Sequence, residues 1–534
     1  MVFTSYGFVG FILLLFFLYY IIPKRFQWVL LLLASFGFYY SAGTYYPLFI
    51  LTTSLTVYAA GRKIGSYDCE LELYEQKIKN GEIPRPSREE KKLYKKQTNQ
   101  KKKRWMLLCL FVNLGILAIL KYTNFTIDNI NVILEQTGSN PLPYADLILP
   151  MGISFYTFQA VGYLLDVYWN RCEPQKHVLR FLLFVSFFPQ LIQGPISRYN
   201  DIKDTLYQKH FFDWKTVRFG LERILWGYFK KLVIADRISA AVGILMEDPD
   251  YYTGAFVLIG MLFYAIQLYA DFTGGIDITI GIAQVFGIHL EENFIRPFFS
   301  KNITEYWRRW HITMGTWFRD YVFYPFSISR PLKAVTSFCK RKYGMAVAKR
   351  AAVYISTMIV WLATGIWHGA NWHFVAWGLT NGLIILISGE LVPLYERFHT
   401  RFPFLERSTC YRAFQIMRTF LLMSCIRLFD NYGSVRTSIR QFVHMFTRFD
   451  IEAVTKQELL DLGLTVSDYA ILGFGVLMMF SVSMAGRNGR AREKVAKWPY
   501  VLKFTAYVLL LFAVLLFGNY GIGFDAKQFI YNQF

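Results

Sequence analysis

The most constraining feature of this sequence is a set of long apolar runs. Residues 6–22, 26–40, 106–120 and 501–517 are the clearest of them. In helical form, about 20 mainly apolar residues cross the hydrocarbon core of a bilayer, which is about 30 Å thick. Further runs cover residues 147–165, 178–194, 218–235, 252–270, 351–367, 372–391, 412–428 and 467–484. The sequence therefore predicts an all-α, polytopic transmembrane protein with about a dozen spans.

Composition and charge agree with a membrane protein. Hydrophobic residues make up 54% of the chain and charged residues only 18%, which is unusual for a soluble domain. The net charge of +21 comes from basic residues that flank the apolar runs and form no separate basic domain. Because membrane topology explains this excess, we expect membrane lipids as partners and no nucleic acid.

One basic segment, residues 61–104, sets the expected topology. It holds fourteen Lys or Arg and seven Asp or Glu, and such segments usually stay in the cytoplasm. The amino terminus is then predicted to lie outside. Residues 66–100 have the pattern of an amphipathic helix interrupted by Pro84 and Pro86, which suits a leaflet surface. A solvated linker is an equal alternative for this stretch.

The rest of the chain argues for a single membrane-embedded domain over residues 1–534. No repeat of fixed period and no low-complexity linker divides it. Residues 274–326 are too polar for plain spans and too apolar for a solvated loop, which predicts short or re-entrant helices packed inside the protein. The six cysteines include no CxxC pair, so neither a disulfide framework nor a metal site is predicted. The first apolar run lacks the basic start and cleavage site of a signal peptide, and we expect it to be retained.

The first cluster of residues that could carry out chemistry is 305–321, in which apolar residues recur at helical spacing. One face of the predicted helix carries Trp307, Trp310, His311, Met314, Phe318 and Tyr321. The other face carries Arg308, Arg309, Thr316, Arg319 and Asp320. So much charge is costly at membrane depth unless it is paired or faces water. An interfacial amphipathic helix with a satisfied histidine is the alternative interpretation.

The second cluster is residues 361–378, an aromatic membrane segment that contains His368, His373 and Asn371. We expect His368 near the outer face, or deep in the membrane if the helix breaks at Gly369. The two histidines are five residues apart and point to different faces of a helix, so they do not form a metal pair. A buried neutral imidazole suits a general base. The alternative for His368 is a structural histidine in a helix break, and His373 fits that role better.

Several motifs are absent, and their absence narrows the chemistry. The sequence contains no GxxxxGK[ST] loop, no GxSxG elbow and no HExxH pair, which weighs against ATP-driven transport and hydrolase chemistry. Acyl transfer from a thioester needs neither a metal nor a protein nucleophile. It needs a base for the acceptor hydroxyl and a donor that stabilises the oxyanion.

These clusters resemble the signature blocks of the membrane-bound O-acyltransferase superfamily. Residues 306–321 are similar to its WRRWH block, and residues 365–372 to its WHG block. Supporting similarities cover residues 149–159, 188–198 and 523–534. Among the superfamily's branches, the pattern is most similar to bacterial members that decorate cell-envelope polymers, and it is closer to the alginate O-acetylation type than to the teichoic-acid D-alanylation type. Residues 324–330 lack the Gly-Gly of many alginate-type members, which leaves the acceptor open.

The resemblance implies a multi-pass enzyme of the bacterial cytoplasmic membrane that moves an acyl group to an extracytoplasmic hydroxyl. It implies acetyl-CoA as the cytoplasmic donor, a cell-envelope polysaccharide as acceptor, and a partner of the SGNH-hydrolase type. No bound cofactor is implied. D-alanyl transfer from a carrier protein to teichoic acid is the alternative within the family.

The resemblance also assigns roles to residues. His368 takes the place of the family's general base, and His311 that of a second histidine that orients or polarises the reacting groups. The neighbouring residues expected to line the substrate tunnel or fix its helices are Trp307, Arg308, Arg309, Trp310, Trp367 and Asn371.

Two rival functions use the same residues differently. In a transporter or flippase for a lipid-linked glycan, the histidines would relay protons or contact substrate. That class more often shows matching interrupted helices in two halves, and no such symmetry is visible in this sequence. A scaffold that recruits envelope enzymes would leave both histidine blocks without explanation.

Overall fold

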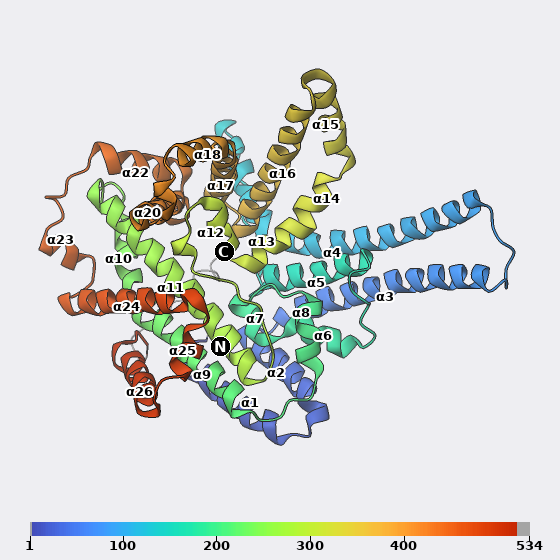
Figure 1. Cartoon of the computed structure of the whole chain (residues 1–534), viewed down its shortest axis with the longest axis horizontal. Helices are drawn as coiled ribbons and strands as arrows, with labels where there is room; N and C mark the ends of the chain where they lie inside the picture. The colour runs from blue at the N-terminus through green and yellow to red at the C-terminus, as the bar shows by residue number, and fades with distance from the viewer. Residues whose placement is uncertain (1–2, 521–534) are drawn as a thin grey trace. The chain divides into compact units, whose positions relative to one another are not determined.

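The computed structural model of the chain describes residues 3–520 (Figure 1). Every regular element within this range is a helix. The chain forms two compact units, one from residues 3–217 and 283–290, the other from residues 218–282 and 291 onward. The predicted carboxyl-terminal motif at residues 523–534 lies outside the described residues.

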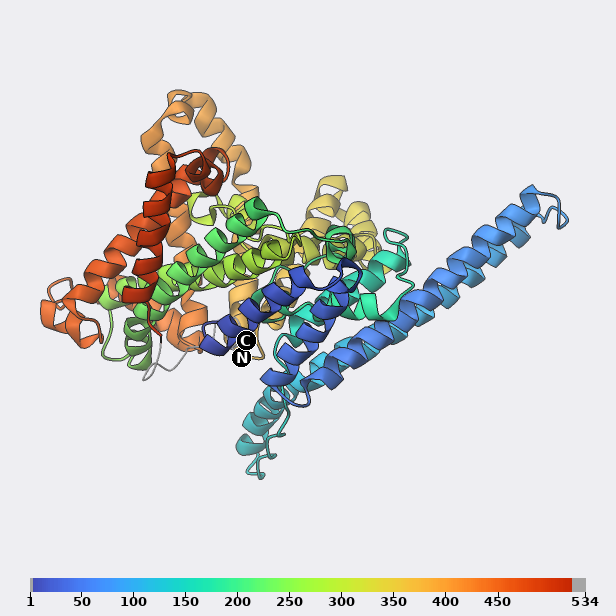
Figure 2. The same cartoon turned by 90° about the horizontal axis from the view of Figure 1, so that it is seen from below.

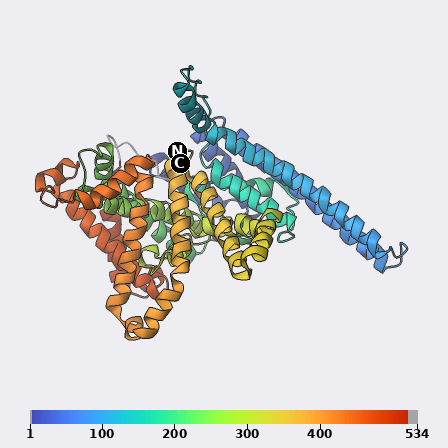
Figure 3. The same ribbon diagram turned by 90° about the horizontal axis from the view of Figure 1, so that it is seen from above.

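The first unit is a set of helices dominated by one long hairpin. Its helices are α1 (Tyr6–Ile21), α2 (Gln27–Ala42), α3 (Tyr46–Lys79), α4 (Arg88–Gln136), α5 (Ile153–Tyr168), α6 (Val178–Ser186), α7 (Phe188–Gln193) and α8 (Tyr199–Tyr207), with a short 3-10 turn η1 (Lys24–Phe26) between α1 and α2. Figures 2 and 3 show α3 and α4, in blue, running side by side along the hairpin.

The hairpin of α3 and α4 contains the basic segment of residues 61–104. As predicted for residues 66–100, the segment is helical and interrupted near Pro84 and Pro86, because α3 ends at Lys79 and α4 begins at Arg88. A capping box starts α4: the Ser87 hydroxyl accepts from the Glu90 N–H at 3.2 Å, and the Glu90 carboxylate accepts from the Ser87 N–H at 2.7 Å. Which side of the membrane the hairpin occupies stays a prediction.

The second unit contains both histidine clusters. It holds most of α9 (Trp214–Tyr228) and of α11 (Ala255–Val285), together with η2 (Phe229–Ala235), α10 (Asp236–Glu247), η3 (Pro297–Phe299), α12 (Ile303–Arg309), α13 (Ile312–Phe318), η4 (Arg319–Phe323), α14 (Tyr324–Ser327), α15 (Arg330–Tyr343), α16 (Met345–His368), α17 (Trp372–Glu390), α18 (Val392–Arg401), α19 (Phe404–Arg407), α20 (Thr409–Ile426), α21 (Leu428–Asn431), α22 (Val435–Thr447), α23 (Lys456–Asp461), α24 (Val466–Ala485), η5 (Gly486–Asn488), α25 (Ala491–Ala496) and α26 (Tyr500–Phe517). Its core is therefore entirely helical within the described range.

Helices α9 and α11 approach each other closely through small residues. A Cβ built on Gly227 would lie 2.7 Å from the carbonyl oxygen of Gly274, so only glycine fits this contact. Near it, Asp277 of α11 pairs with Arg223 at 2.7 Å and with Lys230 at 2.6 Å. Lys230 belongs to the π-helical segment η2. Mutual neutralisation allows these charges to be buried.

Six helices in the described range are long and apolar enough to cross a membrane. They are α4, α11, α16, α17, α24 with η5, and α26, and α1 is a shorter apolar helix. The fold class is thus confirmed, but the expected dozen spans are not. The run 178–194 divides into α6 and α7 at Phe187, and the run 218–235 ends in a π-helical segment that carries Lys230 and Lys231.

The expectation for residues 274–326 is largely confirmed. Residues 297–327 form the short elements η3, α12, α13, η4 and α14. The start of the stretch differs from the prediction, because α11 continues as a regular helix to Val285. This run of short helices is the part of the second unit that carries His311.

Candidate active site

The first histidine lies in a break between two short helices. The prediction of one continuous helix over residues 305–321 is wrong, because α12 ends at Arg309 and α13 begins at Ile312. Between them Trp310 is extended, with φ −105° and ψ 127°, and His311 is left-handed, with φ 46° and ψ 54°. A left-handed conformation is uncommon for a residue other than glycine and marks a position held by its surroundings.

Backbone hydrogen bonds from a distant segment cause this break. The N–H of Ile295 donates to the carbonyl oxygen of Arg309 at 2.9 Å, and the N–H of Ile312 donates to the carbonyl oxygen of Asn293 at 3.0 Å. The loop after α11 thus satisfies backbone groups that a continuous helix would have used. The apolar periodicity of residues 305–321 describes burial for most of the apolar face, but Asp320 of the charged face is also buried, and the periodicity does not show the break in the backbone.

The imidazole of His311 is enclosed by aromatic rings. The residue is 0% exposed, and its ring centroid lies 4.9 Å from that of Phe272 and 6.1 Å from that of Trp367. Its Nδ1 lies 3.3 Å from Oδ1 of Asn293. Burial, followed by the nearby charge of Arg427, lowers the pKa of His311 to about 3. The ring is therefore neutral at physiological pH.

The second histidine ends a long helix. His368 is the last residue of α16, and the next residue, Gly369, is extended with φ −170° and ψ 155°. The helix therefore breaks at Gly369, one of the two arrangements that the sequence left open. His368 is 6% exposed, with its ring centroid 4.5 Å from that of Trp377 and 5.0 Å from that of Trp367.

Close packing between α16 and α17 holds His368 in place. A Cβ on Gly365 would lie 2.5 Å from the carbonyl oxygen of Phe374, and one on Gly378 would collide with the carbonyl oxygen of Trp361. The backbones of the two helices therefore meet at these glycines, which is the packing mode of small residues in membrane helices. The side chain of Asn371 caps α17, accepting from the N–H of His373 at 3.4 Å.

One indole lies against both histidines. Trp367 contacts both His311 and His368, at ring-centroid distances of 6.1 and 5.0 Å. Trp307, from α12, extends the aromatic shell, with its ring centroid 4.7 Å from that of Trp361 and 5.8 Å from that of Trp377. The fold thus gathers two imidazoles from clusters more than fifty residues apart into one buried, aromatic site. Their catalytic roles stay a prediction.

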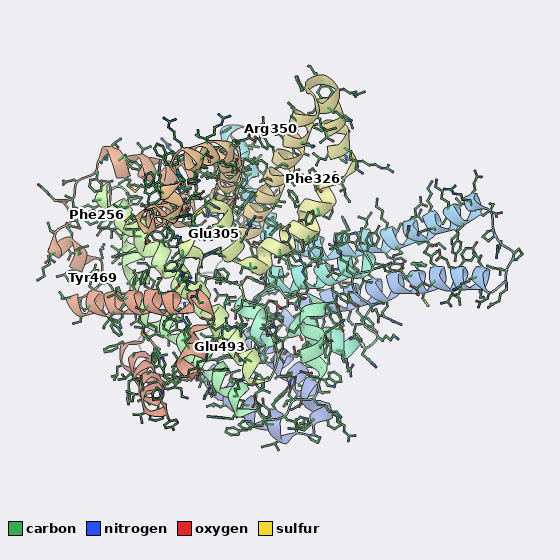
Figure 4. The ribbon with its side chains drawn as sticks, viewed as in Figure 1. Phe256, Glu305, Phe326, Arg350, Tyr469 and Glu493 are labelled. Atoms are coloured by element: carbon green, nitrogen blue, oxygen red, sulfur yellow. The ribbon has the colours of Figure 1, made fainter. Side chains whose placement is uncertain are left out.

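The remaining expected site residues occupy different environments. Trp310 is buried and stacks on Tyr306 at a centroid distance of 5.6 Å. Arg309 pairs with Glu305, labelled in Figure 4, while Arg308 on the same helix is exposed. Asn371 is also exposed, at the start of α17. Of the predicted set, Trp310 and Trp367 are therefore buried, Trp307 and Arg309 are partly exposed, and Arg308 and Asn371 are exposed.

Sequence reasoning did not single out Arg427, which follows α20. It is 6% exposed, pairs with Asp430 at 2.7 Å, and places its guanidinium carbon 5.0 Å from the ring centroid of Trp310 and 5.3 Å from that of Trp377. A charge at the end of an apolar run, here 412–428, is costly without a partner and was the available signal.

Asn293 was also missed, and the sequence carries no signal for it. It is a single asparagine in a loop, and only the tertiary structure brings its side chain to His311 and Thr313. His373, by contrast, agrees with the structural role predicted for it, because its Nδ1 donates to the carbonyl oxygen of Gly433 at 2.9 Å.

Comparison with known proteins adds an independent observation. The model of the membrane-bound O-acyltransferase family matches residues 175–338, a range that includes His311. A probable alginate O-acetylase from Azotobacter vinelandii is 33% identical over 394 residues, which cover 73% of this chain and 69% of that protein. A peptidoglycan O-acetyltransferase from Helicobacter pylori is 31% identical over 338 residues, covering 58% and 60% of the two chains. A teichoic acid D-alanyltransferase from Bacillus subtilis is 28% identical over 292 residues, covering 53% and 69%.

Proposed function

Since the chain belongs to the membrane-bound O-acyltransferase family, we propose that it transfers an acetyl group to hydroxyl groups of a cell-envelope polysaccharide. The predicted family, all-helical membrane fold and O-acyltransferase class are confirmed by this membership. The acetyl group is favoured because two of the relatives described above are named for O-acetylation, at 33% and 31% identity. The D-alanyltransferase relative is less similar, at 28% identity, and keeps D-alanyl transfer as the second candidate.

The observation that carries the proposed mechanism is that two buried imidazoles, His311 and His368, both contact the ring of Trp367. In this mechanism His368 is the general base. It takes the proton of the acceptor hydroxyl as the hydroxyl oxygen attacks the thioester carbonyl carbon. The tetrahedral intermediate then collapses, the C–S bond breaks, and the proton passes to the thiolate leaving group. The reaction converts a thioester and a hydroxyl into an ester and a free thiol. It needs neither a metal nor a covalent enzyme intermediate.

His311 and the aromatic shell prepare the site in this proposal. His311 orients the reacting groups, and Trp307, Trp310 and Trp367 exclude water so that the thioester is not hydrolysed. Arg308, exposed on α12, is available to contact phosphate groups of the donor, and Arg309 would have to exchange its ion pair with Glu305 to do so. Asn371 supports the site by capping α17.

The wider arrangement is also proposed. The donor is acetyl-CoA entering from the cytoplasm, and the acceptor is reached from the other face of the bacterial cytoplasmic membrane, directly or through an SGNH-hydrolase-type partner. The abundance of basic residues at 61–104 supports a cytoplasmic position for the α3–α4 hairpin and an outside amino terminus. The whole chain works as one membrane-embedded enzyme with no bound cofactor.

Acyl transfer is tested in sealed membrane vesicles from cells that express the chain together with its native envelope machinery. Radiolabelled acetyl-CoA is supplied on the cytoplasmic side, and label in ester linkage to polysaccharide is measured beside thiol release. We expect both to appear with wild type and to fall together in His368→Ala. If ester label appears only when a labelled D-alanyl carrier protein is the donor, the transferred group is D-alanyl and not acetyl. Movement of a lipid-linked glycan with no ester formed would overturn the enzyme proposal in favour of a flippase.

A further inference from the structure

We infer that Asn293 is a positioning residue that holds His311 in a single neutral tautomer, with the proton on Nδ1 and the lone pair on Nε2. The geometry of this inference is independent of the reaction. Its catalytic consequence rests on the proposed acyl transfer. Asn293 precedes α12 by a loop and belongs to none of the family-type blocks recognised in the sequence.

The first step is the orientation of the Asn293 amide. Its side-chain oxygen, Oδ1, accepts from the backbone N–H of Thr313 at 3.0 Å. A backbone N–H can only donate, so the atom facing it must be the oxygen and not the nitrogen of the amide. The Thr313 hydroxyl donates to the same oxygen at 2.9 Å. The usual ambiguity between the two ends of an asparagine side chain is thereby removed.

The second step follows from this oxygen. Oδ1 of Asn293 can only accept, and it lies 3.3 Å from Nδ1 of His311. Nδ1 must therefore carry the hydrogen. A charged side chain, Arg427, also acts on the ring and is itself paired with Asp430. Burial and this positive charge keep the imidazole neutral, and a neutral imidazole has one N–H, so Nε2 carries a lone pair.

The third step is rigidity. Asn293 is 0% exposed, and its backbone carbonyl accepts from the N–H of Ile312, the residue directly after His311. Two residues later, the N–H of Ile295 donates to the carbonyl oxygen of Arg309. The loop therefore forms hydrogen bonds with the backbone on both sides of His311. These bonds stabilise its left-handed backbone conformation, and the Asn293 side chain fixes the ring. Such outer contacts orient a catalytic imidazole before substrate arrives.

The consequence refines the role of His311 in acyl transfer. With Nδ1 committed to Asn293, the catalytic face of the ring presents Nε2, which accepts a hydrogen bond and does not donate one. His311 therefore orients the acceptor hydroxyl, or an N–H of His368, by accepting from it. It does not supply the hydrogen bond that stabilises the oxyanion, and that donor must come from another group of the site.

The tautomer is tested directly by nitrogen-15 NMR of the full-length protein in lipid bilayers with labelled histidine. The chain has only eight histidines, and the His311 signals are assigned by their loss in His311→Gln. We expect a protonated Nδ1 and an unprotonated Nε2 in wild type, and a shift toward the Nε2–H form in Asn293→Leu. A protonated Nε2 in wild type would overturn the inference, whatever the protein's activity.

Kinetics supply the second readout. Asn293→Leu is expected to lower kcat for acyl transfer about 10- to 100-fold with little change in KM for the donor, as for other groups that orient a catalytic histidine. Asn293→Asp keeps an oxygen toward Nδ1 and is expected to recover most of this loss. Asn302→Leu is the matched control, because Asn302 caps the neighbouring helix α12 by accepting from the Glu305 N–H at 2.8 Å.

These outcomes separate the possible failures. Equal losses of kcat in Asn302→Leu and Asn293→Leu would show that Asn293 acts only by stabilising the start of a helix, and would overturn its positioning role. Absence of acyl transfer in wild type, with the NMR tautomer as expected, would refute the proposed function and leave the inference about His311 standing.

Discussion

The two histidines both sit at helix breaks, but the breaks have different origins. At His368 the break is local: α16 stops at the histidine because Gly369 follows, and Asn371 starts the next helix with its own cap. At His311 the break is imposed from a distance, since residues 293–295 bind the backbone on both sides of it. The comparison shows that a helix break at a candidate site can be caused by residues adjacent in the sequence, or by contacts that form only in the folded protein.

The largest expected effect is a loss of kcat when a histidine is replaced, and its size should differ between His368 and His311. His368→Gln should lower kcat about 10²- to 10⁴-fold, because it removes the proposed general base. His311→Gln should cost less, about 10- to 100-fold, because it removes an orienting acceptor. His373→Gln is the control and should leave kcat nearly unchanged, since its Nδ1 is bonded to Gly433. Turnover of labelled acetyl-CoA measures all three, and a larger loss at His311 than at His368 would reverse the assignment.

The local break should be sensitive to helix packing. Gly365→Ala places a methyl group 2.5 Å from the carbonyl oxygen of Phe374, so α16 and α17 must separate. We expect a loss of about 1–3 kcal/mol in stability, seen as a lower Tm in detergent. Gly389→Ala, in the neighbouring helix α17, is the control because its Cβ would meet no atom within 4 Å. Equal Tm values for both variants would contradict the close contact.

The imposed break should show in the pH dependence of stability. The pKa of His311 is lowered to about 3 in the folded protein, while in the unfolded chain it is close to 6.5. Between these values only the unfolded chain binds the proton. The stability from the neutral ring is therefore complete above pH 6.5 and is lost as the pH falls, by up to about 1.4 kcal/mol per pH unit. Tm measured against pH should fall less steeply below pH 6.5 in His311→Gln than in wild type, and parallel curves would refute a buried neutral His311.

The smallest expected effect concerns the cap beside His368. Asn371→Ala removes the side chain that accepts from the His373 N–H and should cost about 1 kcal/mol in stability. Asn371→Ser should retain most of the stability that the cap contributes, because serine also caps helices. A large rise in KM for the donor, without a change in Tm, would instead make Asn371 a substrate contact.

Much of the fold follows from the apolar runs, and the differences have physical causes. Helices α4, α11, α16, α17, α24 and α26 coincide with predicted spans because a long apolar helix satisfies its own backbone and needs no distant partner. Run 178–194 failed as one span because the chain turns at Phe187, and apolar composition does not encode such a turn. Run 218–235 is helical through α9 and η2 but is not among the six candidate spans, and its Lys230 is buried beside Asp277, a pairing that a linear sequence does not display.

The sequence by itself determined that the chain is a helical membrane protein and that two histidine-bearing aromatic blocks distinguish it, and it offered a break at Gly369 as one of two arrangements for the second block. Each of these depends on residues close together in the chain. The tertiary structure alone decided that Trp367 contacts His311, that Arg427 lies beside Trp310, and that the Asn293 side chain lies beside His311. Those contacts form between residues far apart in sequence, where burial makes each hydrogen bond and charge depend on its neighbours in space.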